Sequence, residues 1–331
     1  MPTVNRMGFW LGSTAPLNAF SMHPALSIIL FTTLSGAGLG LAAVIGLFGH
    51  PDGSAVVPQL PLLPAAVCAL LLTGGGLVCS LFHLRRPTRA WRALSQWRSS
   101  WLSREGILAP AAMLALAALV FLDQYRLTVG LILFLLCLGA TYATSMIYAQ
   151  LRAVPAWNTP QTALLFLAFA AAGGLLTAAT LASFLPDTPG LQAIDDRFLI
   201  AATLAILFAW AIQALWWRRL DKVGTGASTP ETATQLGAIG PVRLLEPPHT
   251  GSNYLLDEMG HKIARRHATK LRHIALTAGG LIPIALLLLT QMSGTTPGIT
   301  LLALPAHLAG VAISRWLFFA EARHTVTLYY S

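Results

Sequence analysis

The stretch LILFLLCLGATYATSMIYA, residues 131–149, decides the fold of this 331-residue chain, because it holds nineteen consecutive residues without a charged side chain. A helix rises about 1.5 Å per residue, so a run of this length crosses the roughly 30 Å of hydrocarbon in a bilayer. A strand of a membrane β-barrel would instead alternate apolar and polar residues over about ten positions. The stretch therefore predicts a transmembrane α-helix.

The composition extends this prediction to the whole chain. Hydrophobic residues make up 55% of it, charged residues only 10%, and the mean hydropathy is +0.66. A soluble domain would carry about a quarter charged residues. We therefore expect an all-α integral membrane protein, a single domain over 1–331, with eight transmembrane helices in a bundle and one long cytoplasmic loop at 218–272. The predicted spans are about 25–48, 61–83, 106–122, 127–149, 160–184, 198–217, 273–291 and 299–320.

The basic residues gather on one side of the membrane if the helices alternate in direction. That side would carry 18 Lys and Arg residues, six of them within 85–104 and nine within 218–272, whereas the other side would carry only Arg126 and Arg197. Because short loops rich in Lys and Arg stay in the cytoplasm, we expect a multi-pass protein of the bacterial inner membrane with both termini cytoplasmic. The basic residues flank helices, which favours contact with lipid or an acidic partner over binding of nucleic acid.

The chain lacks the residue patterns that redox metals need. Its three cysteines, Cys68, Cys79 and Cys137, lie singly in apolar spans without the spacing of an iron–sulfur site. Haem held between helices usually takes two histidines at matching depth, but His307 alone lies near the middle of a span. We expect no haem, iron–sulfur cluster or other metal in this chain, and we interpret His307 as a hydrogen-bonded core residue.

Two ionisable residues face each other across one connection: His83 closes the second predicted span and Glu105 opens the third. A histidine can hydrogen-bond a quinone oxygen and a carboxylate can relay a proton, so the pair suits quinone chemistry at the membrane edge. The structural alternative remains open, because Glu105 also suits a helix N-terminus and His83 an interfacial position.

The segment HLRRPTRAWRALSQWRSSWLSREG, residues 83–106, resembles the membrane-anchor subunits of dimethyl sulfoxide reductase-type molybdoenzymes, the DmsC family. The eight-span length agrees with that family as well. The matching positions are His83, Leu84, Pro87, Arg89, Ala90, Leu94, Ser100, Leu102, Ser103 and Glu105. The resemblance implies an anchor that binds quinone (menaquinone or ubiquinone) and holds an iron–sulfur subunit, which connects to a molybdopterin catalytic subunit.

The resemblance also implies roles for individual residues of this segment. His83 and Glu105 would bind the quinone and transfer protons. The family tends to have small residues where Arg85 and Arg86 stand here, and Trp97 and Trp101 enrich the loop. We assign the remaining members to two groups: quinone binding for Arg89, Trp101 and Arg86, and partner contact for Arg85, Arg92, Arg98 and Trp97.

The long insertion at 218–272 and the ending at 310–330 resemble the sulfite-oxidising branch of the family. Charge counting places the His83 connection inside the cell, so the partner subunits would lie on the cytoplasmic face and pass electrons from sulfite to quinone. Three alternatives remain: a sulfoxide-type reductase that oxidises quinol, a purely structural anchor, and a secondary transporter. We further expect a helix from Tyr254 onward at the inner interface, and an interfacial anchor at Arg315, with contact to the quinone or Glu105 as its alternative.

Overall fold

The computed structural model describes residues 24–48, 62–82, 87–184, 192–224, 226, 229–243, 245–246, 262–293 and 297–325. Eight of its helical runs are long and apolar enough to cross a membrane, which confirms the all-α membrane fold. The crossing helices are α1 (Pro24–Phe48), α2 (Leu62–Leu81), α3 (Trp101–Phe121), α4 (Arg126–Ala149), α5 (Pro160–Ala182), α6 (Gln192–Val223), the run of α10 (Ala268–Leu276), η3 (Thr277–Leu281) and α11 (Ile282–Ser293), and α12 (Pro297–Ala320). The shorter elements are η1 (Pro87–Gln96), η2 (Asp123–Tyr125), α7 (Pro230–Thr234) and α9 (Lys262–Arg266).

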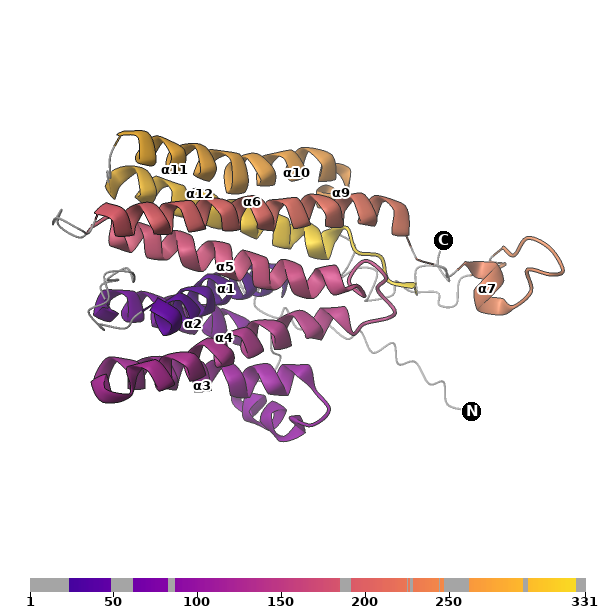
Figure 1. Ribbon diagram of the computed structural model, residues 1–331. Coiled ribbons are helices and arrows are strands. Elements are labelled where there is room, and N and C mark those ends of the chain that lie inside the picture. The colour runs from indigo at the N-terminus through magenta and orange to yellow at the C-terminus, as the bar shows by residue number, and fades with distance from the viewer. Residues whose placement is uncertain are drawn as a thin grey trace, which may run out of the picture.

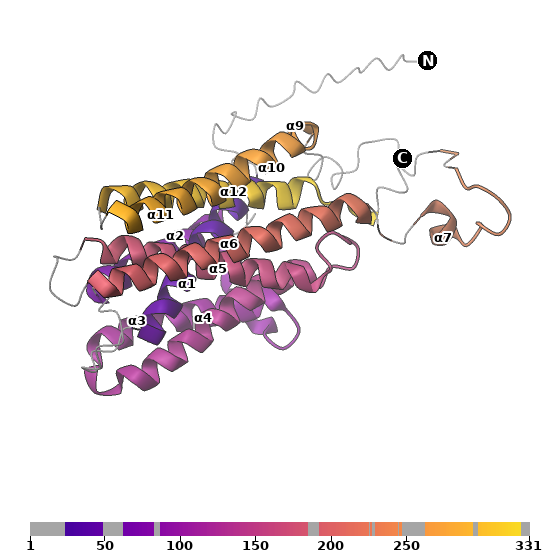
Figure 2. The same ribbon diagram turned by 45° about the horizontal axis from the view of Figure 1, so that its top comes forward.

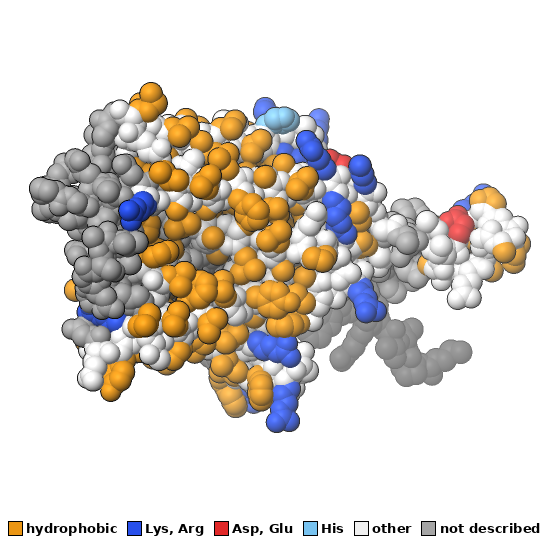
Figure 3. All heavy atoms as spheres, viewed as in Figure 1, with side chains coloured by type: hydrophobic (Ala, Val, Ile, Leu, Met, Phe, Trp, Pro, Cys, Tyr) orange, Lys and Arg blue, Asp and Glu red, His pale blue; other side chains and the backbone are white. Residues whose placement is uncertain are grey.

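Successive crossing helices run in opposite directions, so alternate connections meet at the same end of the bundle (Figure 1). The end of α2, the short helix η1, the start of α3 and α7 share one end, which is also where α12 finishes (Figures 1 and 2). Lys and Arg side chains gather at this end, while hydrophobic side chains cover the middle of the face shown in Figure 3. We call it the basic end.

The helices α1 and α5 form the centre of the bundle. In each of them 72% of the most apolar window is buried, against 28% in α2 and in α3. Their backbones touch at two glycines, because a Cβ on Gly40 would lie 1.8 Å from the carbonyl oxygen of Ala170 and one on Gly174 would lie 2.2 Å from Gly40. Such close approach by small residues is the usual way in which membrane helices pack.

A wide π-type turn interrupts the seventh crossing helix at η3, where the N–H of Ile282 donates to the carbonyl of Thr277. At this turn Gly279 packs against Gly310 of α12, whose Cβ would lie 2.2 Å from the Gly279 Cα. The Gly279 carbonyl accepts a hydrogen bond from the indole of Trp210 in α6 at 2.8 Å. The turn therefore ties α6 and α12 to the seventh helix.

Charged side chains tie the last helices together at the basic end. Arg272 of α10 forms ion pairs with Asp221 of α6 at 2.8 Å and with Glu321, just after α12, at 2.7 Å. Arg265 of α9 donates to the carbonyl of Ala320, the last residue of α12, at 2.7 Å and to that of Ala322, just after the helix, at 3.0 Å. A guanidinium is well suited to orphan carbonyls at a helix C-terminus.

Several boundaries differ from the sequence-based expectation. The sixth crossing helix spans Gln192–Val223 and not 198–217, and the seventh run begins at Ala268 and not at 273. The third crossing helix begins at Trp101, five residues before the predicted start at 106, because Ser100 caps it. The described part of the final basic helix begins at Lys262, and the stretch from Tyr254 to 261 lies outside the described residues. The earlier start of α3 moves Glu105 from the helix N-terminus into its second turn.

Candidate functional site

The start of α3 positions the residues on which the sequence-based site depends. Ser100 adopts an extended conformation, and its hydroxyl accepts a hydrogen bond from the N–H of Ser103 at 3.4 Å. Glu105 follows one turn later and is only 4% exposed. Glu105 therefore does not cap α3, because the cap is Ser100 and the Glu105 carboxylate is buried against α4.

Glu105 meets α4 through a hydrogen bond to the hydroxyl of Thr144, which is also buried. The same hydroxyl lies 3.0 Å from the carbonyl oxygen of Ala140 in the preceding turn of α4. A hydroxyl has one hydrogen and can accept as well as donate. Thr144 can therefore donate to the Glu105 carboxylate, or donate to Ala140 while accepting from a protonated Glu105.

The connection before α3 folds back onto its first turns. The hydroxyl of Ser103 donates to the Ala93 carbonyl in η1. Arg104 donates from Nε to the Trp97 carbonyl at 3.0 Å and from Nη2 to the Arg98 carbonyl at 2.7 Å. These bonds hold η1 and the turn after it against the helix that carries Glu105.

Trp101 lies one turn before Glu105 on the same face of α3, since residues four apart on a helix are neighbours. Its ring packs edge-on against Tyr142 of α4, with 5.6 Å between centroids, and the Arg104 guanidinium lies 4.2 Å from the Trp101 ring centroid. The side chain of Tyr142 is exposed. The aromatic pair therefore joins α3 to α4 one turn before Glu105.

The predicted residues that the structure describes on η1 and the turn after it show no contact with Glu105. Arg89, Arg92, Trp97 and Arg98 are exposed on η1 and the turn after it, and within the described part of the chain no contact joins them to the carboxylate. Arg92 and Arg98 each lie 5.5 Å from the ring of the preceding tryptophan. His83, Arg85 and Arg86 lie outside the described residues.

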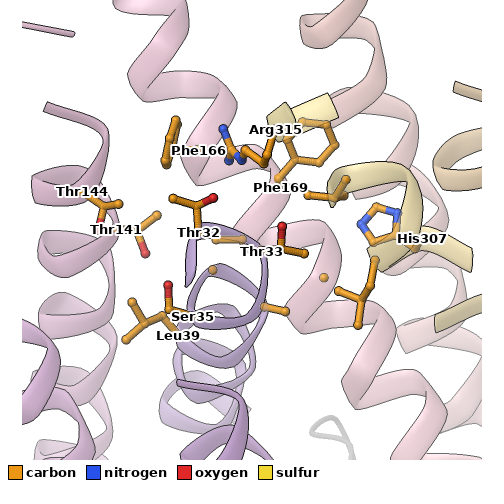
Figure 4. Close-up of a pocket in the computed structure, with 16 residues that line it drawn as sticks. Thr32, Thr33, Ser35, Leu39, Thr141, Thr144, Phe166, Phe169, His307 and Arg315 are labelled. Carbon is orange, nitrogen blue, oxygen red and sulfur yellow. The ribbon is translucent and has the colours of Figure 1, made fainter. Parts of the chain in front are cut away.

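Arg315 is the residue whose predicted position differs most from its position in the structure. It was expected to be an interfacial anchor, but it is 2% exposed and its guanidinium carbon lies 3.6 Å from the Phe166 ring centroid and 5.6 Å from that of Phe169. Figure 4 shows it between these two rings, facing α1 and α4. The spacing of His307, Val311 and Arg315 on one face of α12 is the signal that could have predicted this burial.

Tyr148 lies four residues after Thr144 on the same face of α4 and links the surroundings of the two buried charges, Glu105 and Arg315. Its ring stacks on Phe166, with 5.8 Å between centroids, and the guanidinium of Arg315 lies over the Phe166 ring. The two charges thus belong to one buried cluster that spans α3, α4, α5 and α12. Sequence spacing could not reveal it, because its members come from four separate helices.

His307 is fully buried, and its Nδ1 lies 2.7 Å from the Gly279 carbonyl oxygen, which confirms its interpretation as a hydrogen-bonded core residue. The three cysteines are free, with Cys137 buried and Cys68 and Cys79 partly buried. Among the described residues no group of three or more His, Cys, Asp or Glu side chains could hold a metal ion.

Comparison with known proteins adds independent findings. Residues 21–232 match the family described as DMSO reductase anchor subunit (DmsC). Over 334 aligned residues the chain is 34% identical to a protein of Allochromatium vinosum that is named as a subunit of sulfite dehydrogenase, and the alignment covers 93% of this chain and 99% of that relative. No solved structure matches the chain.

Proposed function

The chain belongs to the DMSO reductase anchor subunit family, and on this premise we propose that it is the quinone-reactive membrane anchor of a sulfite-oxidising molybdoenzyme complex. The similarity to a sulfite dehydrogenase subunit supports the choice of sulfite as the electron source. Molybdopterin and iron–sulfur clusters would reside in partner subunits. This chain would supply the site where electrons leave the partner's iron–sulfur clusters and reduce quinone in the membrane.

The buried carboxylate of Glu105 is the observation that carries this proposal. Reduction of a quinone to a quinol takes up two electrons and two protons, so the site needs a group that can hold and release protons. Ionisable residues within membrane helices are rare and usually functional. Glu105 lies in the second turn of α3, next to a threonine hydroxyl that can reverse its hydrogen bond, and one turn after Trp101, whose ring packs against Tyr142.

The residues at the start of α3 and near the end of α4 suit a quinone. The exposed faces of Leu102, Ile107 and Tyr142 offer an apolar surface along which an isoprenoid tail could lie, while Glu105 supplies a buried polar atom behind it. In this proposal His83 binds the quinone with Glu105, and both transfer protons. Arg86, Arg89 and Trp101 complete the quinone-binding group.

The basic end is proposed to face the cytoplasm, because it holds most of the Lys and Arg residues. The exposed residues Arg92, Trp97 and Arg98 at this end would contact the iron–sulfur subunit, together with Arg85. An exposed tryptophan flanked by arginines is a composition typical of protein interfaces. Electrons would then pass from sulfite in the cytoplasm, through the partner's clusters, to quinone at the inner leaflet.

The experiment that tests the proposed function uses the whole complex with the variants His83→Ala and Glu105→Gln. We expect both complexes to assemble with the partner subunits and to reduce a soluble electron acceptor with sulfite normally, while sulfite-driven quinone reduction is lost. His267→Ala, an exposed histidine at the same end, is the matched control and should leave both activities unchanged. Normal quinone reduction by both variants would show that the chain is a structural anchor or that the quinone binds elsewhere.

A further inference from the structure

A small cavity lies between α1, α4, α5 and α12, and Thr144 is among the residues that line it (Figure 4). Its volume is about 20 Å³. A cavity needs roughly 10–15 Å³ of such space to hold one water molecule, together with two to four polar partners. The space is therefore sufficient for a water molecule and too small for a quinone ring.

Three buried polar side chains that line this cavity have atoms without a hydrogen-bond partner. These atoms are Nε and Nη1 of Arg315, Nε2 of His307 and Oγ1 of Thr33. The side chains are 2%, 0% and 5% exposed, respectively. Leaving a buried donor or acceptor unsatisfied costs about 1–3 kcal/mol, and more for a charged group. Such a concentration of unpartnered groups around one cavity indicates that something polar fills it.

The arrangement of donors and acceptors matches water. The Gly279 carbonyl can only accept, so the Nδ1 of His307 must carry the hydrogen of their 2.7 Å bond. In the neutral imidazole Nε2 is then an acceptor, whereas the Arg315 nitrogens can only donate. A water molecule can accept from a guanidinium and can donate to an imidazole nitrogen, so water suits each of these groups.

The cavity is connected to Glu105 through Thr144. The Thr144 hydroxyl lines the cavity and also forms the hydrogen bond to the Glu105 carboxylate. Because this hydroxyl can both donate and accept, it can pass a proton between the cavity water and the carboxylate by exchanging its hydrogen bonds. Thr141, one turn away on the same helix, lines the cavity as well.

We propose that this cavity holds internal water that extends the proton path of Glu105 through Thr144, and that Arg315 is a positioning residue that binds and orients that water. This inference rests on the proposed function, because it assigns a second, internal stage to the delivery of protons to the quinone site. The group relayed is a proton, and no bond other than O–H or N–H forms or breaks.

The polar lining ends near the middle of the bundle. Beyond Leu39, Thr141 and Ala170, which both cavities share, a second cavity of about 190 Å³ follows between α1, α4 and α5. Among its other lining residues are Val44, Phe48, Phe134, Cys137 and Leu175, all apolar. Within the described residues the water would therefore form a branch that opens toward Glu105, and this proposed path would not continue to the opposite end.

A substitution that fills the cavity tests its role in turnover. Gly36 lines the cavity, and a Cβ there would meet no atom within 4 Å, so Gly36→Ala can place a methyl group in the space of a water molecule without a clash. Gly75→Ala in α2 is the matched control, because its Cβ also meets nothing and the residue does not line the cavity. We expect Gly36→Ala to slow sulfite-driven quinone reduction several-fold and to change its solvent deuterium isotope effect, with the KM for quinone unchanged. Equal kinetics for the two variants would overturn the proposal.

A direct test of hydration does not depend on any activity. X-ray radiolytic labelling modifies side chains next to bound water, so Phe166 and Phe169 should be labelled in the intact complex although they are 3% and 4% exposed. Phe318, 1% exposed and absent from the cavity lining, is the matched control and should remain unlabelled. Gly36→Ala should abolish the labelling of Phe166 and Phe169. Absence of label in the unmodified complex would show that the cavity is dry.

The two tests separate this inference from the proposed function. Loss of quinone reduction in Glu105→Gln together with a dry cavity would overturn the internal water alone. Labelled cavity residues together with normal quinone reduction in Glu105→Gln would overturn the proposed quinone role of Glu105 and, with it, the role of the water in turnover. Arg315→Met should lower the rate of quinone reduction. Arg315→Lys should lower it less, because lysine can still donate to the water.

Discussion

The hydroxyl of Thr144 in α4 and the carboxylate of Glu105 in α3 form a buried hydrogen bond between residues that are 39 positions apart in the chain. Valine at position 144 would keep the shape of the side chain but remove its only donor. Hydrogen bonds to charged groups contribute about 1.5–3 kcal/mol, and each 1.4 kcal/mol in a barrier is about tenfold in rate. We therefore expect Thr144→Val to lower the kcat of sulfite-driven quinone reduction about tenfold or more.

Serine is the control at this position, since Thr144→Ser retains the hydroxyl and should keep most of the activity. Assays with a soluble electron acceptor separate an effect at the quinone from an effect on the partner subunits. If Thr144→Val and Thr144→Ser reduce quinone at the same rate, the hydrogen bond has no part in turnover.

The loop before α3 provides a prediction about assembly. Arg92 and Arg98 are exposed at the basic end beside Trp91 and Trp97. We expect the double variant Arg92→Gln/Arg98→Gln to co-purify less iron–sulfur subunit at low salt, with a difference from the unmodified chain that shrinks as salt is raised, because exposed charges are screened by ions. The single variant Arg197→Gln, at the opposite end of the bundle, should leave the recovered stoichiometry unchanged. Equal recovery of the partner across the salt series would argue against a docking role for this loop.

The contact between Gly310 and Gly279 makes a prediction about stability. A methyl group at position 310 would lie 2.2 Å from the Gly279 Cα, so Gly310→Ala must push α12 away from the seventh helix. Overpacking of this kind costs about 1–3 kcal/mol. Thermal unfolding in detergent should show a lower midpoint for Gly310→Ala than for Gly298→Ala, a control in the same helix whose Cβ meets no atom within 4 Å. Identical midpoints would mean that the two helices can move apart without a measurable loss of stability.

The ion pairs of Arg272 predict a further difference in stability. This arginine bridges Asp221 and Glu321, and its side chain is 17% exposed. Removal of Arg272 takes away the ion pair of Glu321, whose side chain is only 9% exposed, whereas Asp221 is exposed to solvent. Arg272→Met should therefore lower the thermal midpoint more than Arg266→Met, which removes an exposed arginine from the same basic segment. A midpoint that is the same in both variants would show that the bridge contributes nothing measurable.

The orientation of the bundle can be measured with single cysteines introduced into a cysteine-free background. Glu246 lies in the connection between α7 and α9 at the basic end, and Gln124 lies between α3 and α4 at the opposite end; both are exposed. We expect a membrane-impermeant thiol reagent to label Gln124→Cys in intact spheroplasts and to label Glu246→Cys only after lysis. The reverse pattern would place the partner subunits outside the cytoplasm.

The crossing helices could be predicted from the sequence because each apolar run is longer than a bilayer requires. The start of α3 could not be predicted, because Trp101 and Arg104 are typical of a polar connection. In the structure both residues belong to the helix, and the Arg104 guanidinium lies over the Trp101 ring. Charge near a helix end also misled the interpretation of Arg315. A hydropathy pattern indicates how deep a residue lies, but only the packing of α12 against α5 shows that the side chain faces inward.

The same distinction separates Glu105 from Thr144. The carboxylate could be singled out by its rarity at a membrane edge and by the resemblance of its segment to a known family. Thr144 is one of several threonines in apolar helices, and most of them simply donate to the carbonyl four residues earlier. Its partnership with Glu105 depends on which faces of α3 and α4 meet, and a single sequence does not contain that information.

The way in which Arg104 holds the preceding turn has a consequence for how this surface could change during evolution. Arg104 grips main-chain oxygens of Trp97 and Arg98, so the course of the turn is fixed independently of the side chains displayed there. Mutations at 97 and 98 could thus change the exposed side chains of this surface while the backbone of the turn keeps its conformation. A lineage could adapt such an anchor to a new soluble enzyme without rebuilding the membrane bundle.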